Sequence, residues 1–239
     1  MQHYFIKGKK EDFFYLDSSD EHHIRHVMRF HNGENVYGIY QGKKYLCELK
    51  ITDKDLYLNP LKTMDAKDKN YNLTLIQALP KGDKFDLILQ KATELGVDNI
   101  VPFLSERSIV RIEKKDYEKK IERWKKIVKE ASEQSERLTI PTIYNPCNLK
   151  ELLSYFKGEV LLMDERKGRK ESQTLFEYLL KSSCKEFTII VGPEGGFSDN
   201  EFNFFEEYGV QQLSLGSQIL RSETAAIVSC ALVGSSKEK

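Results

Sequence analysis

The sequence predicts an α/β protein in which a small β-rich domain precedes a larger domain of alternating strands and helices. The first 70 residues contain short segments of alternating apolar and polar residues, which are typical of half-buried strands. From Leu73 onward, apolar runs alternate with amphipathic helical patterns, which implies parallel pairing in one sheet. Residues 62–70 are polar and aperiodic, so we place the boundary there and expect domains at 1–70 and 71–239.

One short helix is expected in the first domain. Ser18 and Glu21 have the spacing of a capping box, which predicts that the helix begins there. The apolar stripe of this helix would consist of Ile24, Val27 and Met28. Asn32-Gly33 would end it, because both residues tolerate the left-handed conformation.

A β-hairpin is expected after this helix. Segments 34–40 and 43–52 alternate in polarity, and Gln41-Gly42 between them is suited to a two-residue turn. A further short strand is expected at 55–57.

The second domain is expected to contain six strands separated by helices. The candidate strands are 73–79, 100–104, 141–144, 159–163, 187–191 and 212–215. One helix has a single apolar face and is closed by Gly96; that face comprises Phe85, Ile88, Leu89, Ala92 and Leu95. A long basic helix carries a second such face, formed by Tyr117, Ile121, Trp124, Val128 and Ala131.

Composition excludes several protein classes. The chain has 239 residues, with 37 Lys+Arg and 37 Asp+Glu. No segment approaches the roughly 18 apolar residues of a membrane helix, and the first residues lack the apolar core of a signal peptide. The 4 cysteines contain no CxxC pair, which argues against a zinc site or a disulfide framework and favours a reducing, cytoplasmic location.

Charge is unevenly distributed although the net charge is zero. Residues 105–139 carry 11 basic and 8 acidic side chains, whereas residues 140–239 carry 11 basic and 14 acidic ones. The basic stretch suits either a solvated helix face or a local contact with phosphates. Neutrality therefore argues only against binding of nucleic acid through bulk charge.

The segment 192–198, with the sequence GPEGGFS, follows a buried strand and precedes a helix. Ser198 and Glu201 have capping-box spacing, so the helix is expected to begin after Ser198. Ligands of parallel sheets bind at the carboxyl ends of strands, where this loop must lie. It lacks the lysine of a P-loop and the GxGxxG of a dinucleotide fold, and Glu194 favours a cationic or neutral ligand. The same glycines also suit a tight strand-to-helix turn.

A second loop, at 216–221, leaves the last predicted strand and leads into an apolar helix. Ser222 is suited to the N-cap position of that helix. Arg221 lies where the helix macrodipole is already positive, which is unfavourable unless the arginine serves an anion. A salt bridge between Arg221 and Glu223 is the alternative explanation.

Five blocks of sequence resemble one known family. They lie in the family's order over nearly the whole chain, at residues 22–33, 81–97, 130–137, 192–198 and 213–225. The last two contain the segments GPEGGFS and LSLGSQILRSETA. Together they closely resemble the signatures of the RsmE-type 16S ribosomal RNA (uracil-N3)-methyltransferases.

The resemblance implies a PUA-like β-barrel that binds RNA at 1–70 and a SPOUT methyltransferase domain at 71–239. SPOUT domains are α/β with a C-terminal trefoil knot, bind S-adenosylmethionine in the knotted loops and work as homodimers. Carried onto this chain, the cofactor-binding residues would be Leu162, Met163, Val191, Gly192, Pro193, Glu194, Gly195, Gly196, Leu215, Gly216, Ser217, Ile219, Leu220, Thr224 and Ala225.

Two residues are candidates for catalysis. Methylation of uracil N3 requires loss of the N3 proton and stabilisation of the negative charge that develops on the ring. Arg221 is expected to stabilise that charge as a fixed donor to a carbonyl oxygen. Glu194 is expected either to accept or relay the proton or to orient a loop by hydrogen bonding.

The expected RNA partner is 16S ribosomal RNA, free or within the 30S subunit. Basic residues that suit phosphate contacts are Arg25, Arg29, Lys81, Lys84, Arg107 and Arg111. His22 and His26 lie one helical turn apart but have no acidic or cysteine partner at ligand spacing, so we expect no metal.

Two other functions remain open at this point. A SPOUT methyltransferase that acts on another RNA, such as transfer RNA, would share the same motifs. A non-catalytic RNA-binding or ribosome-assembly factor would share the fold but would not need the intact loops at 192–196 and 216–225.

Overall fold

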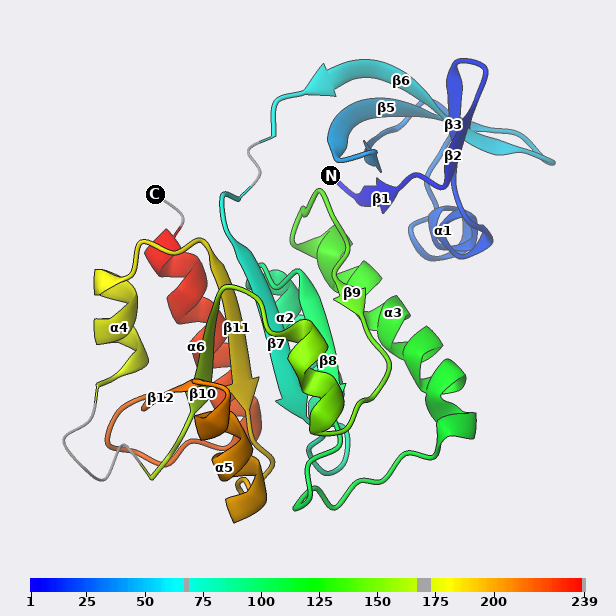
Figure 1. Cartoon of the computed structure of the whole chain (residues 1–239). Helices are drawn as coiled ribbons and strands as arrows, with labels where there is room; N and C mark the ends of the chain where they lie inside the picture. The colour runs from blue at the N-terminus through cyan, green and yellow to red at the C-terminus, as the bar shows by residue number, and fades with distance from the viewer. Residues whose placement is uncertain (67–68, 167–172, 238–239) are drawn as a thin grey trace. The chain divides into compact units, whose positions relative to one another are not determined.

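The computed structural model describes residues 1–66, 69–166 and 173–237, and the chain forms two compact units (Figure 1). Unit 1 comprises Met1–Asp68 and Ser132–Thr139, and unit 2 comprises Lys69–Ala131 and Ile140–Lys239. The sequence assigned residues 132–139 to the second domain, but two bonds tie this segment to unit 1. Lys44 Nζ donates to Glu136 Oε2 at 2.9 Å, and the Phe5 amide donates to Glu133 Oε1 at 3.4 Å. Of the expected linker, residues 67–68 lie outside the described residues.

Unit 1 is built on a six-stranded sheet in the order β1-β4-β5-β6-β3-β2. The strands are β1 (His3–Phe5), β2 (Gly8–Lys10), β3 (Phe13–Tyr15), β4 (Asn35–Tyr40), β5 (Lys43–Ile51) and β6 (Leu56–Met64). β1 and β4 are parallel, whereas the other pairs are antiparallel. β5 and β6 are strongly curved (Figure 1). The buried core includes Tyr4, Phe14, Ile24, Val36, Leu49 and Leu58.

The predicted hairpin is confirmed, and the strand after it is longer than expected. Gln41 and Gly42 have φ values of 50° and 72°, as a tight hairpin turn between twisted strands requires. The strand expected at 55–57 extends over Leu56–Met64 and takes up part of the predicted linker. Pro60 lies opposite Cys47, where the β5–β6 register shifts, so its missing N–H falls at an irregularity of the ladder.

The short helix of unit 1 begins one residue earlier than predicted. α1 (Ser18–His22) is capped by Asp17, whose carboxylate accepts from the Ser19 and Asp20 amides at 3.0 and 2.9 Å. The predicted Ser18 cap is therefore wrong. An Asp carboxylate is an equally good acceptor for the free amides of a first turn.

A π-helical segment, η1 (His23–Val27), continues α1. Its wider turn rotates Val27 away from the face of buried Ile24, and the Val27 side chain is 61% exposed. The predicted stripe of Ile24, Val27 and Met28 therefore does not form. The segment ends at Arg29, which takes the left-handed conformation with φ 54°, before the predicted stop at Asn32-Gly33.

Unit 2 contains a six-stranded sheet in the order β12-β10-β11-β7-β8-β9. Its strands are β7 (Asn72–Ala78), β8 (Asn99–Phe103), β9 (Thr142–Ile143), β10 (Glu159–Met163), β11 (Glu186–Val191) and β12 (Gln211–Leu213). Every pairing is parallel, which confirms the predicted α/β class and the six predicted strands. Their carboxyl ends therefore meet at one edge of the sheet.

Helices cover both faces of this sheet (Figure 1). One face packs against α2 (Lys84–Glu94), α3 (Tyr117–Gln134), α4 (Leu175–Lys181) and α6 (Ser222–Lys237). The other packs against η3 (Lys150–Tyr155) and α5 (Asp199–Glu207); a short 3₁₀ turn, η2 (Lys114–Asp116), precedes α3. Between α2 and α3, the Phe85 and Trp124 rings meet edge to face at 4.8 Å, as the predicted apolar faces require. Among the described residues, no helix combines the length and apolar character needed to span a membrane.

Candidate active site

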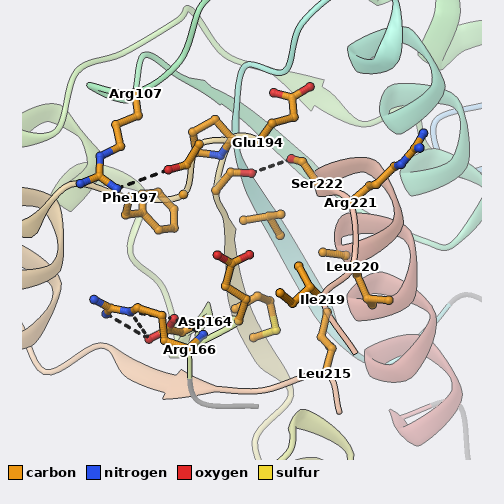
Figure 2. Close-up of a pocket in the computed structure, with 18 of the residues that line it drawn as sticks. Arg107, Asp164, Arg166, Glu194, Phe197, Leu215, Ile219, Leu220, Arg221 and Ser222 are labelled. Carbon is orange, nitrogen blue, oxygen red and sulfur yellow. Dashed lines mark hydrogen bonds and ion pairs between the residues drawn. The ribbon is translucent and has the colours of Figure 1, made fainter. Parts of the chain in front are cut away.

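Three loops at the carboxyl ends of β10, β11 and β12 line one cavity of about 490 Å³ in unit 2 (Figure 2). We call them the β10 loop (163–166), the glycine loop (192–196) and the α6 entry loop (215–221). The wall is completed by Arg107, which follows β8, and by Val191, Phe197, Asp199, Phe202, Ser222 and Ala225. The strand order explains this meeting, because β12, β10 and β11 are adjacent in the sheet.

Most of the predicted cofactor residues line this cavity. They are Met163, Val191, Gly192, Pro193, Glu194, Gly195, Gly196, Leu215, Gly216, Ile219, Leu220 and Ala225. Leu162 does not line it, because alternation along β10 directs its side chain into the core on the α5 face. Ser217 and Thr224 are exposed outside the lining.

The β10 loop contributes residues that the sequence analysis missed. Asp164 is 3% exposed, and its carboxylate accepts from the Arg166 amide at 2.9 Å and from two nitrogens of the Arg166 guanidinium. That guanidinium in turn lies 3.2 Å from the centre of the Phe202 ring. Their position in the sequence could have indicated a role in the site, because residues 164–166 directly follow a predicted strand of a parallel sheet, and ligands bind at such strand ends.

The glycine loop is a tight turn against an aromatic cluster. The Gly196 amide donates to the Pro193 carbonyl at 2.9 Å, and Gly196 has a φ of 66°, which disfavours other residues. A Cβ on Gly192 would lie 3.0 Å from the Phe197 ring. Phe197 is buried against Phe103, Phe202 and Phe205, so the loop rests on a packed base.

Ser222 joins the glycine loop to α6. Its hydroxyl donates to the Gly192 carbonyl at 2.6 Å (Figure 2). The same hydroxyl accepts from Gln77 Nε2 at 2.9 Å. The Arg221 carbonyl accepts the first bond of α6, from the Ala225 amide at 2.8 Å. Arg221 therefore occupies the N-cap position, and the predicted Ser222 cap is wrong. The Ser222 hydroxyl serves the neighbouring loop instead.

Glu194 is held by the segment that begins α2. Its carboxylate accepts from Lys84 Nζ at 2.8 Å and from the Lys81 amide at 3.2 Å. Partial burial raises the pKa of Glu194, but the hydrogen bond from Lys84 and the bonds from backbone amides outweigh that effect and hold the pKa below its usual value. The carboxylate is thus kept ionised and is a weak proton acceptor.

Arg221 is exposed at the rim of the cavity. No ion pair or side-chain hydrogen bond to Arg221 occurs among the described residues, so the alternative pairing with Glu223 is not observed. Glu223 instead lies 3.5 Å from Lys84 Nζ. Figure 2 shows the Arg221 side chain extending away from Leu215 and Ile219. Its guanidinium is available to a ligand or substrate at the cavity mouth.

The other predicted RNA contacts lie at several places. In unit 2, Arg107 lines the cavity and donates to the Gly195 carbonyl at 3.4 Å, Arg111 donates to the Ser105 and Glu106 carbonyls, and Lys81 is exposed. In unit 1, Arg25 donates to the Asp55 carbonyl at 2.8 Å and Arg29 is exposed. Within the described ranges, no group of three or more His, Cys, Asp or Glu side chains could hold a metal ion.

Comparison with known proteins assigns the chain to a class and then to a family. The sequence model of a family described as an RNA methyltransferase domain matches residues 67–234, which span the whole cavity wall. The fold and its cavity are therefore those of an RNA methyltransferase domain. Ribosomal RNA small subunit methyltransferase E of Bacillus subtilis is 33% identical over 239 residues, covering 95% of this chain and 93% of that protein. The protein of the same name from Mesomycoplasma hyopneumoniae is 35% identical over 228 residues, covering 95% and 96%.

A solved structure agrees with these relatives. The structure of a ribosomal RNA small subunit methyltransferase E from Neisseria gonorrhoeae bound to S-adenosyl methionine has a TM-score of 0.83 to this chain at 29% identity. The likeness covers 98% of this chain and 97% of that one. The chain belongs to the ribosomal RNA small subunit methyltransferase E family.

Proposed function

We propose that this enzyme transfers a methyl group from S-adenosylmethionine to N3 of a uridine in 16S ribosomal RNA. The observation that carries the proposal is the convergence of the β10 loop, the glycine loop and the α6 entry loop on one cavity. The relative from Neisseria gonorrhoeae, a member of the same family, was solved with S-adenosyl methionine bound. Neither a binding module nor a phosphate-dependent enzyme needs this combination of loops.

The cavity wall fits the cofactor chemically. Apolar side chains of Met163, Leu215, Ile219 and Leu220 suit the flat face of adenine, and the glycine loop can bring backbone groups close to the ligand. Carboxylates of Glu165 and Asp199 line the cavity together with the guanidinium groups of Arg107 and Arg166, so charges of both signs are available to the ligand. When bound, S-adenosylmethionine supplies an already activated methyl group on a positively charged sulfur, so the protein mainly has to position it.

Arg221 is the proposed charge-stabilising residue. Loss of the N3 proton places negative charge on the two carbonyl oxygens that flank N3. A guanidinium held at the N-terminus of α6 adds to the positive end of that helix and would favour this charge. Its exposure at the cavity mouth leaves it accessible to a base of the RNA.

We propose that unit 1 is a PUA-like barrel and that unit 2 carries a C-terminal trefoil knot. The long curved strands β5 and β6 support the barrel. The knot is supported by the chain order near the end of the sheet. β12 is an edge strand beside β10, whereas α6, which follows it, packs on the central strands β7 and β11.

We propose in addition a homodimer that acts in the cytoplasm. Phe176 and Leu180 on α4 are 54% and 66% exposed, one turn apart on the same helix, and so offer an apolar surface to a second copy. The proposed phosphate contacts are Arg25 and Arg29 in unit 1 and Lys81, Arg107 and Arg111 in unit 2.

Mass spectrometry of nucleosides from small-subunit ribosomal RNA tests the proposed function. We expect cells that lack the gene to lose N3-methyluridine and a plasmid copy to restore it. Unchanged N3-methyluridine, with loss of the methyl group from another RNA, would identify a different substrate. If isothermal titration calorimetry shows that the purified protein does not bind S-adenosylmethionine, the chain is a non-catalytic member of the family.

A further inference from the structure

A single lysine contacts both the glycine loop and the first turn of α6. Lys84, the first residue of α2, places Nζ 2.8 Å from Glu194 Oε1 and 3.5 Å from Glu223 Oε2. Glu194 belongs to the glycine loop and Glu223 to the first turn of α6. Two segments that meet at the cavity are therefore joined through one ammonium group.

Of these three charged residues, Glu194 lines the cavity, but its carboxylate is engaged by other protein groups. Lys84 and Glu223 are absent from the cavity lining, and the Glu194 carboxylate is taken up by Lys84 and the Lys81 amide. Figure 2 shows the Glu194 side chain turned away from Ile219 and Leu220. Among the described residues, the three charged groups contact one another and the Lys81 amide, so we expect them to act on a ligand through the loops that they hold.

Glu223 depends on the lysine for its counter-charge. Its side chain is 12% exposed, and its buried Oε2 accepts no hydrogen bond within the described residues. Removal of the Lys84 ammonium would leave this carboxylate and Glu194 facing each other across the gap. A partly buried carboxylate without a partner is costly, so the two segments would then move apart.

The protonation states support a structural pairing. The pKa of Lys84 is raised above its usual value, first by the hydrogen bond to Glu194 and further by the charges of Glu194 and Glu223. The pKa of Glu194 is lowered, as described above. Both groups are therefore charged over the whole physiological pH range, and neither is tuned to exchange a proton near neutrality.

We propose that Lys84, Glu194 and Glu223 form a positioning clamp that fixes the glycine loop against the start of α6 in the geometry that binds S-adenosylmethionine. The identity of the ligand rests on the proposed function. Glu194 is thereby a positioning residue, which selects the second of the two roles that its sequence left open. The Lys84 ammonium group is engaged by these two carboxylates and is not a phosphate contact.

The clamp is not the sole connection between the two segments. The Ser222 hydroxyl also donates to the Gly192 carbonyl, and Gln77 supports it from β7. Loss of the clamp should therefore loosen the loops without unfolding the domain, which makes variants of Lys84 and Glu194 measurable.

The principal test is a double-mutant cycle on cofactor affinity. We expect Lys84→Met and Glu194→Ala each to raise the Kd for S-adenosylmethionine, measured by calorimetry, about tenfold. The double variant should be no weaker than either single one, because both remove the same clamp. Lys84→Arg should restore most of the affinity. Lys91→Met is the matched control: Lys91 is on the same helix and is ion-paired, with Glu94 at 2.9 Å, but does not line the cavity.

Turnover separates positioning from direct chemistry. At saturating cofactor, the fall in kcat on ribosomal RNA in both single variants should be smaller than the rise in the Kd for the cofactor. A kcat loss of a hundredfold or more in Glu194→Ala, with an unchanged cofactor Kd, would make Glu194 a proton acceptor and overturn the proposal. A raised KM for RNA in Lys84→Met, with an unchanged cofactor Kd, would make Lys84 an RNA contact and overturn it equally.

Hydrogen exchange without cofactor gives an independent measurement. In Lys84→Met, amides of the glycine loop and of the first turn of α6 should lose protection together, whereas Lys91→Met should leave both unchanged. Loss of amide protection in only one of the two segments, or in neither, would overturn the proposed clamp. A wild-type protein that does not bind the cofactor would instead contradict the proposed function, and the exchange result would still decide whether the clamp exists.

Discussion

At the scale of single residues, one hydroxyl holds together parts of the chain that are far apart in sequence. The Ser222 hydroxyl lies between Gln77 of β7 and Gly192 of the glycine loop. Ser222 is 6% exposed, so water cannot readily replace either bond. A side chain that looks like a helix cap in the sequence instead bridges strand β7 and the glycine loop.

Replacing Ser222 should destabilise the protein more than replacing a serine elsewhere on α6. Ser222→Ala removes the donor to the Gly192 carbonyl and one of the two acceptors of Gln77 Nε2, whose bond to the Ala78 carbonyl remains; we expect a cost of about 1–3 kcal/mol of unfolding free energy. Urea denaturation measures this cost. Ser235→Ala is the control, because that exposed hydroxyl bonds only locally, to the Ala231 carbonyl at 2.6 Å. Equal losses in the two variants would contradict the bridging role.

Arg221→Ala should separate binding from chemistry. We expect kcat to fall about 10²–10³-fold, since a fixed donor to developing charge is lost. The Kd for S-adenosylmethionine should change little, because the guanidinium extends away from Leu215 and Ile219 (Figure 2). Single-turnover methylation and calorimetry provide the two measurements. Wild-type turnover in this variant would remove Arg221 from the mechanism.

The sequence located the loops of the site better than the individual side chains. The glycine loop and the α6 entry loop were predicted from strand ends, glycines and family resemblance, and both line the cavity. Asp164 was missed because nothing in its local sequence shows that it is buried beneath Arg166. The partnership of Lys84 with Glu194 was also missed, because 110 residues separate them and only the tertiary fold brings them together.

At the scale of elements, α4 and α5 begin with the same capping box but in different surroundings. In α5, the predicted box is confirmed: Ser198 accepts from the Glu201 amide, and Glu201 accepts from the Ser198 amide at 2.7 Å. Glu201 is fully buried and also accepts from the Glu106 amide at 2.9 Å. In α4, Thr174 and Glu177 form the same pair at the surface.

The two capping glutamates should therefore differ in their contribution to stability. Glu177→Ala removes only an exposed cap contact and should lower the free energy of unfolding slightly. Glu201→Ala also leaves buried amides of Ser198 and Glu106 without an acceptor, so we expect a cost of about 2–4 kcal/mol. Chemical denaturation of the two variants side by side gives the comparison. A Glu201 cost no larger than that of Glu177 would contradict this ranking.

Strand prediction was most accurate where burial is complete. The inner strands β7, β8, β10 and β11 of unit 2 are covered on both faces, so each appears in the sequence as a largely apolar run. β6 extends well beyond the strand expected at 55–57, and Pro60 within it falls at a register shift of the ladder. The π-helical turn after α1 could not be predicted, because hydrophobic spacing was interpreted with the period of an ordinary helix.

At the scale of the whole molecule, acid should weaken unit 1 in particular. His3 is buried and stacked on Tyr37 at 4.9 Å. Burial, helped by the positive charge of Lys44, lowers the pKa of His3 below its ordinary value of 6.5, although Glu136 acts in the opposite direction. The unfolded chain therefore binds this proton more readily than the folded one. Stability is then fully present above the ordinary pKa and declines as the pH falls below it.

Urea unfolding followed at several pH values tests this expectation. The midpoint should fall between about pH 7 and pH 5.5, and His3→Phe, which retains a ring against Tyr37, should flatten the decline. His31→Phe is the control, because His31 is exposed on the same unit. An unchanged pH slope in His3→Phe would exclude His3 as its source.

The return of residues 132–139 to unit 1 has a consequence for protein synthesis. A chain leaves the ribosome from its N-terminus, so β1 and β5 emerge well before Glu133 and Glu136, which bond to them. Unit 1 thus cannot complete its contacts until more than half of the polypeptide has been made, and β7, α2 and β8 are translated in the meantime. The two units must mature in an interleaved order, although their sheets contain no strand in common.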